Sequence, residues 1–255
     1  MSKYDAFGTI LNMGTGLVQV ETATIAGAIT GDGNATVTIT AAGMSGSPVA
    51  LSVPVLNGDA VAVTAAKIAA FINDDASAAA IKGWFYATSS GADVILTRKI
   101  PMANDATLNI AYTNDTCTGL TPDATSADTQ VGETLGPVAQ VVNLSGPGLS
   151  LDTEDVTTHD SANAWEELVA TIIRTGELSL DIVYDPAHAD HDASTGFPGL
   201  LEARTVVGFN ITFPDTAGTV WSFAAVVNGF EPGAAHDGAL TAAVKLKLTG
   251  EPILA

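Results

Sequence analysis

The chain has 255 residues, of which 47% are apolar and 15% are charged, and its formal net charge at pH 7 is −19. This apolar content argues against a disordered chain, and the acidity argues against a protein that grips nucleic acid, since such affinity comes largely from Lys and Arg. Few aromatic residues, and short apolar runs broken by Gly, Asn and Asp, predict a sheet-rich protein with many turns.

The first residues, MSKYDAFGTILNMG, lack the basic start and the continuous apolar core of a signal peptide. No stretch approaches the roughly 20 apolar residues of a membrane span. We therefore expect a protein made and used in a cytoplasm, without membrane insertion. The lone Cys117 is expected to be an inert thiol.

Composition divides the chain into an outer region and an inserted one. Residues 1–18 predict an opening strand at 6–11, and residues 136–255 carry longer alternating strands. Between them, residues 19–135 are rich in Ala, Thr and Asp and close in a polar, turn-rich segment. This order predicts a discontinuous domain formed by 1–18 and 136–255, with a small α+β domain at 19–135 inserted into one of its loops.

The inserted region combines strands with one helix. The helix is predicted to begin after an N-cap at Asp59. Its apolar residues recur on one face at Val61, Ala65, Ile68 and Ile72. Strands are predicted at 34–43, 48–56, 84–90, 92–99 and 107–113. The helix is expected to cover a small sheet.

The outer region is predicted to be dominated by strands, at 138–146, 176–186, 206–213, 220–229 and 239–250. The clearest is 176–186. Its apolar residues Leu178, Leu180, Ile182 and Tyr184 alternate with the polar residues Glu177, Ser179 and Asp181. One face of this strand should therefore meet a core and the other should meet water.

One or two short helices should accompany these strands. An irregular acidic loop is expected at 149–161, followed by an amphipathic helix capped by Asp160 or Ser161. Its apolar stripe is Trp165, Leu168, Val169 and Ile172. A second helix is predicted at 195–203, with Pro198 in its first turn.

The densest groups of reactive side chains lie in two loops. Residues 188–192 read HADHD, but their spacing matches no zinc or calcium motif, so a solvated polar loop is expected. Residues 158–161 include Ser, His and Asp, yet residues this close in sequence seldom form a nucleophilic triad. No phosphate-binding loop ending in Gly-Lys-Ser/Thr occurs. The sequence thus favours a protein that is not an enzyme, with no catalytic residue, metal or other cofactor.

The longest ordered motif of the chain is SGPGLSLDTEDVTTHDSANAWEELVATIIRTGELSLDIVYDP, at 145–186. A Ser-Gly-Pro-Gly turn, an acidic DVTTHDS loop, a Trp-Glu-Glu segment and GELSLDIVYDP follow one another. In this order the pieces resemble the major tail tube proteins of non-contractile, siphovirus-type bacteriophages, as do the terminal segments AFGTILNMG and KLTGEPI. The inserted region resembles a module of several phage tail proteins, in VETATIAG, AAGMSGSP and LTRKIPMANDATLNIAY.

The resemblance implies a mainly β (α+β) fold, a tail-tube β-sandwich or barrel subunit with one or two short helices. Hexameric rings would close a β-barrel lumen and stack into the conduit for DNA ejection, with the inserted domain on the tube exterior. Physical reasoning agrees, because joined sheets remove exposed edges and head-to-tail interfaces generate rings and filaments. The implied partners are further copies of the chain, tail tip and tape measure proteins, and the tail terminator. The implied location is the virion tail, assembled in the host cytoplasm.

Charge suggests which residues meet the DNA. Outside the insert, 5 basic residues stand against 17 acidic ones. If the polar face of 176–186 lines the lumen, Glu177 and Asp181 repeat around each ring as a negative wall, and DNA passes transiently without adhering. Contacts between rings or subunits are assigned to Asp152, Glu154, Asp155, His159, Asp160 and Trp165.

Two other classes of protein stay open. A type VI secretion-like tube subunit would share the hexameric barrel, although the insert and the 145–186 motif favour the phage protein. A carbohydrate-binding or adhesion module would fit the Thr-rich, β-rich texture, for the whole chain or for the insert alone.

Overall fold

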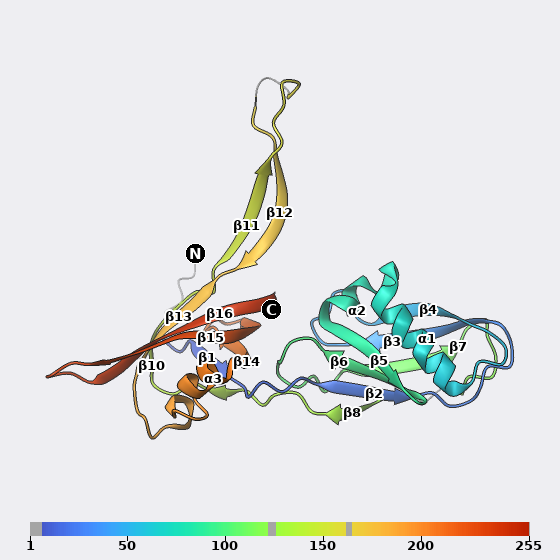
Figure 1. The fold of residues 1–255 in the computed structure, drawn as a ribbon, viewed down its shortest axis with the longest axis horizontal. Helices are drawn as coiled ribbons and strands as arrows, with labels where there is room; N and C mark the ends of the chain where they lie inside the picture. The colour runs from blue at the N-terminus through green and yellow to red at the C-terminus, as the bar shows by residue number, and fades with distance from the viewer. Residues whose placement is uncertain (1–6, 122–125, 162–164, 255) are drawn as a thin grey trace. The chain divides into compact units, whose positions relative to one another are not determined.

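The computed structural model describes residues 7–121, 126–161 and 165–254, and these residues form two compact units (Figure 1). Unit 1 comprises Met1–Met13 and Pro137–Leu254, and unit 2 comprises Gly14–Gly136. Each unit has a hydrophobic core of its own. Ala6, at which the predicted opening strand begins, lies outside the described residues.

Unit 1 is built on a seven-stranded sheet in the order β10-β13-β16-β15-β14-β1-β9. The strands are β1 (Ile10–Met13), β9 (Gly136–Pro137), β10 (Val141–Ser145), β13 (Glu177–Val183), β14 (Val206–Thr212), β15 (Val220–Ala234) and β16 (Leu240–Leu254). The sheet curls into a half-barrel, as Figure 1 shows around β15 and β16. The prediction of a mainly β fold with few, short helices is confirmed.

Strand alternation gives the sheet one apolar and one polar face. On β13, Leu178, Leu180 and Ile182 are buried while Glu177, Ser179 and Asp181 are exposed, as their alternation predicts. β16 and β14 add further buried side chains to the same core, which include Val207, Phe209, Val244, Leu246 and Leu248.

One short helix packs on the apolar face of this sheet. The helix α3 (Phe197–Ala203) has Pro in its first turn, and the prediction of a helix at 195–203 is confirmed. Phe197 is fully buried in the core of unit 1. The helix ends at Arg204, whose φ of 55° is left-handed. This packing leaves the opposite, polar face of the sheet uncovered by α3.

Residues 149–175 hold the main departure from the predicted elements. They contain an antiparallel pair, β11 (Leu149–Asp155) and β12 (Leu168–Thr175), which projects from the sheet of unit 1 (Figure 1). The predicted loop at 149–161 and the predicted helix through Trp165 and Ile172 are therefore wrong. β12 reads LVATIIRT, whose β-branched residues suit an extended backbone, and pairing with β11 satisfies backbone groups that a lone helix would satisfy internally.

Unit 2 contains a four-stranded sheet, β5-β6-β2-β8, and a three-stranded sheet, β4-β3-β7. The strands are β2 (Val20–Thr24), β3 (Gly33–Thr40), β4 (Val49–Val55), β5 (Phe85–Ser90), β6 (Asp93–Arg98), β7 (Asn109–Asn114) and β8 (Ala127–Gln130). A one-turn 3-10 segment (Ala76–Ala78) and the short α2 (Ala79–Trp84) precede β5. Both sheets contribute to one core.

The helix α1 (Val61–Asp74) packs on this core through Ala65, Ile68 and Ile72, the face that its spacing predicts. The predicted N-cap is wrong, because Ala60 occupies that position. Asp59 instead accepts a hydrogen bond from the Leu56 backbone N–H at 2.8 Å and pairs with Lys67 at 2.5 Å. Within the described residues, no helix is long and apolar enough to cross a membrane.

Candidate functional site

The side of the seven-stranded sheet opposite its core carries many polar side chains, here called the polar face. Its members are Asn12, Asn143, Ser145, Glu177, Ser179, Asp181, Asn210, Ser222, Asn228, Glu231, Lys245, Lys247 and Thr249. Charged groups gather on β13, β16 and the distal part of β15, whereas β1 and β14 contribute amides. Asn12 donates from Nδ2 to Asn210 Oδ1 at 2.6 Å.

The two acidic residues singled out in the sequence, Glu177 and Asp181, both lie exposed on this face. Side-chain amides bind both carboxylates. Asn228 Nδ2 donates to Glu177 Oε1 at 2.5 Å, and Asn143 Nδ2 donates to Asp181 Oδ2 at 3.4 Å. The register places Lys247 directly opposite Glu177. The neighbourhood of these carboxylates is therefore mixed in charge.

A second lysine completes the charged part of the polar face. Lys245 lies opposite Ser179 on β13, and its Nζ is 3.6 Å from Glu231 Oε1 on β15. Since three carboxylates stand beside two ammonium groups, the charge of this part of the face is close to balanced. Sequence alone cannot predict this, because the lysines are separated from β13 by several elements.

The β11–β12 hairpin exposes apolar side chains along both strands. They are Leu149, Leu151, Leu168, Val169, Ile172 and Ile173, with Trp165 near the tip. Trp165 is 75% exposed and Ile173 is 71% exposed. Large apolar side chains exposed in this number on both faces of one hairpin are typical of a contact between proteins.

The predicted contact residues all fall on this hairpin or its tip. Asp152, Glu154 and Asp155 belong to β11, and Asp152 pairs with Arg174 of β12 at 2.5 Å. Hydrogen bonds from the Thr157 side chain and backbone hold the pKa of Asp155 below its ordinary value. His159 and Asp160 are exposed at the tip.

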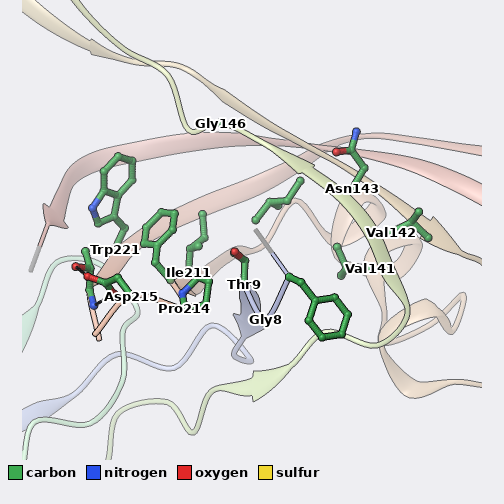
Figure 2. A pocket seen from close by; sticks show the side chains of 14 residues that line it. Gly8, Thr9, Val141, Val142, Asn143, Gly146, Ile211, Pro214, Asp215 and Trp221 are labelled. Carbon is green, nitrogen blue, oxygen red and sulfur yellow. Dashed lines mark hydrogen bonds between the residues drawn. The ribbon is translucent and has the colours of Figure 1, made fainter. Parts of the chain in front are cut away.

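A hollow of about 980 Å³ lies in the curl of the sheet (Figure 2). Val141 and Val142 of β10 line one side of it, and Ile211 and Trp221 of β14 and β15 line the other. The end strand β10 and the more central strands β14 and β15 thus border one space, which reflects the curl of the sheet.

The carboxylate that lines the hollow is held by hydrogen bonds. Asp215 accepts hydrogen bonds at 2.7 Å from the Thr219 hydroxyl and from the Thr219 backbone N–H. These bonds hold the pKa of Asp215 below its ordinary value and fix the turn between β14 and β15. The arrangement is that of a structural turn and offers no acid–base pair.

The loop at 188–192 is organised around a buried histidine, so the expectation of a solvated loop is wrong for this residue. His191 is fully buried, and its Nδ1 accepts a hydrogen bond from the Asp185 backbone N–H at 3.1 Å. Its Nε2 lies 3.2 Å from the Ala139 carbonyl oxygen, to which it donates when protonated there. Among the described residues, no group of His, Cys, Asp and Glu is arranged to hold a metal ion.

Unit 2 contains a buried carboxylate that the sequence did not reveal. Glu21 of β2 is 2% exposed, and the Ser126 hydroxyl donates to it. Burial, the largest cause, acts together with the nearby Asp128 and Asp105 to raise the pKa of Glu21 to about 7, against the lowering effect of the Ser126 hydrogen bond. The folded unit therefore retains a proton on Glu21 at mildly acidic pH.

This retained proton predicts a pH dependence of stability. Because the pKa is higher in the folded chain than its ordinary value of 4.5, the contribution is fully present below that pH and is lost as the pH rises to about 7. Glu21→Gln removes the titrating group. Its melting temperature relative to wild type should therefore rise between these pH values and level off above them, as measured by calorimetry.

Glu202→Gln, an exposed substitution on α3, serves as the control for this measurement. It should give a flat difference over the same pH range. A flat difference for Glu21→Gln as well would contradict the assignment.

Comparison with known proteins gives one family. Residues 120–255, slightly more than half of the chain, match the family model described as lambda phage tail tube protein. No curated protein matches the sequence significantly.

Several solved structures are similar to part of the chain. One is the virion of a native gene transfer agent particle, with 18% identity, a TM-score of 0.40, and coverage of 48% of this chain and 88% of that chain. The tail of an empty gene transfer agent particle with C6 symmetry gives 17% identity, a TM-score of 0.39, and coverage of 48% and 86%. The baseplate of the anti-feeding prophage gives 14% identity, a TM-score of 0.38, and coverage of 48% and 84%.

Proposed function

The chain belongs to the lambda phage tail tube protein family, and from this premise we propose that it is the repeating subunit of a non-contractile, siphovirus-type tail tube. It is a structural component of a phage tail and not an enzyme. In the proposal, copies of the chain form hexameric rings, and the rings stack into a hollow conduit through which DNA leaves the virion.

The observation that carries this proposal is an open, curled sheet with an edge strand at its end. In the described part of the chain, β10 ends the sheet order with β13 as its neighbour. An exposed edge strand invites pairing with another chain. Pairing between copies would extend the half-barrel into a closed barrel, which leaves no edges.

The β11–β12 hairpin is proposed to make the contacts between rings or subunits. Its exposed apolar strands would be buried on docking, and Asp152, Glu154, Asp155, His159, Asp160 and Trp165 would lie at or near that contact. Since the contact is between different surfaces of identical chains, it propagates along a filament.

The remaining assignments follow from the need for an open channel. The polar face is proposed to line the lumen, so that Glu177 and Asp181 face the passing DNA. The domain predicted at 19–135 is proposed to project on the tube exterior, because a domain inside the channel or at a ring interface would block it. Tail tip, tape measure and terminator proteins would be the other partners of the tube. Assembly would take place in the host cytoplasm.

Negative-stain electron microscopy of the purified chain tests the proposal. Samples are examined over a range of protein concentrations, alone and with tail tip complexes. Hollow tubes with a regular ring repeat and outward projections are expected. Globular particles under every condition would contradict the tube assignment, and smooth tubes would contradict the exterior position of the insert.

A further inference from the structure

We propose that the carboxylates of the polar face offset the charge of Lys245 and Lys247, so that these lysines do not bind DNA phosphates as DNA passes. The inference rests on the proposed function, because it assumes that the polar face meets DNA. It gives Glu177, Asp181 and Glu231 a role different from that of a uniform negative wall.

The first support is the position of Lys247. It lies directly opposite Glu177 in the antiparallel register of β13 and β16, the distance at which opposite charges on one face attract. Asn228 donates to Glu177 Oε1, and this hydrogen bond anchors the carboxylate beside the lysine. A carboxylate held by Asn228 thus occupies the register position next to Lys247 on the neighbouring strand.

The second support is the path of Lys245. A Cβ atom at Gly229 would lie 3.3 Å from both Cβ and Cδ of Lys245, so the lysine stem runs closely over this glycine. Gly229 is the register partner of Lys245 on β15. The absence of a side chain there lets the lysine lie along the sheet, with Nζ 3.6 Å from Glu231 Oε1.

The third support is the placement of carboxylates around Lys245 on β13. Lys245 faces Ser179, and the next residues on the same face of β13 are Glu177 and Asp181. Diagonal neighbours in a sheet lie within reach of a long side chain. Glu231 on the other side is the carboxylate within ion-pair distance of Lys245, and Glu177 and Asp181 occupy the two diagonal positions on β13.

The consequence concerns DNA passage. Free lysines bind phosphates by releasing counterions, and repetition of two lysines around every ring and along the tube would multiply that binding. Carboxylates beside those lysines weaken the attraction and leave a surface close to neutral in this region. DNA would then meet a polar surface that neither binds it nor strongly repels it.

The test measures DNA binding by the full-length purified chain. Fluorescence anisotropy of a labelled DNA duplex is followed at low and at physiological salt for wild type and for Glu177→Gln/Glu231→Gln. The variant should bind at least about tenfold more tightly at low salt, with a salt dependence that steepens by roughly one unit of log–log slope for each lysine engaged. Adding Lys245→Gln and Lys247→Gln to this variant should return binding to the wild-type level.

A matched control separates pairing from net charge. Glu202→Gln/Asp237→Asn removes the same number of exposed carboxylates away from the charged part of the polar face and should leave DNA binding unchanged. An equal gain in this control, or no gain in Glu177→Gln/Glu231→Gln, would overturn the inference. A gain that survives removal of both lysines would overturn it too.

A second variant displaces a lysine without changing any charge. Gly229→Ala places a methyl group against the Lys245 stem, so it should raise DNA binding in a way that Lys245→Gln cancels. Thermal unfolding checks that each variant is folded, and electron microscopy checks tube formation separately. If wild type forms no tubes, the proposed function fails, whereas tubes with unaltered DNA binding in both variants reject only the lysine pairing.

Discussion

Replacing Ile172 and Ile173 by Asp should abolish tube formation while leaving the subunit folded. The two side chains are 58% and 71% exposed, and as adjacent strand residues they point to opposite faces of the hairpin. Their burial in a contact would contribute about 1.5–3 kcal/mol each, and a carboxylate buried in their place costs more. Because about 1.4 kcal/mol corresponds to a tenfold change in affinity, the protein concentration needed for tubes should rise more than about a hundredfold.

Sedimentation and electron microscopy measure this loss, and thermal unfolding shows that the subunit remains intact. Val63→Asp is the matched control, since Val63 is 45% exposed on α1 of unit 2 and the change is the same in kind. Tubes should form normally with Val63→Asp. Normal tubes with the hairpin variant would contradict the proposed contact, and loss of tubes with both variants would mean that any added charge prevents assembly.

The elements predicted well are those in which the spacing of apolar residues fits a strand or a helix but not both. Strict alternation on β13 predicts its buried and exposed residues, and helical spacing predicts the buried face of α1. The hairpin was missed because Trp165, Leu168 and Ile172 fit helical spacing by coincidence. The conformation of β12 is decided by pairing with the acidic β11, which lies earlier in the chain and has no strand-like composition.

The polar face was predictable only in part. Exposure of Glu177 and Asp181 follows from local alternation, whereas their neighbours follow from register. Lys247 is 70 residues from Glu177 in the sequence, and nothing local shows that β13 pairs with β16 in this alignment. The burial of His191 could not be predicted from the sequence either, because its hydrogen-bond partners are backbone groups of two separate segments.

His191→Ala is expected to have the largest effect on stability. The side chain is fully buried, and its loss leaves the Asp185 N–H and the Ala139 carbonyl without their partner. Each unsatisfied buried group costs about 1–3 kcal/mol, and the cavity adds to this cost. A loss of about 3–5 kcal/mol should lower the melting temperature of unit 1 by roughly 10 °C or more.

His188→Ala is the matched control in the same loop, because the side chain of His188 is 40% exposed and its removal should cost less than about 1 kcal/mol. Calorimetry of the two variants measures the loss of stability. Equally small decreases in melting temperature would show that the buried His191 does not stabilise this loop. Ala139 lies just before β10, which begins at Val141. If β10 is the edge that pairs between copies, His191→Ala should also impair tube formation at temperatures where the subunit is still folded, since the start of that edge loses its support.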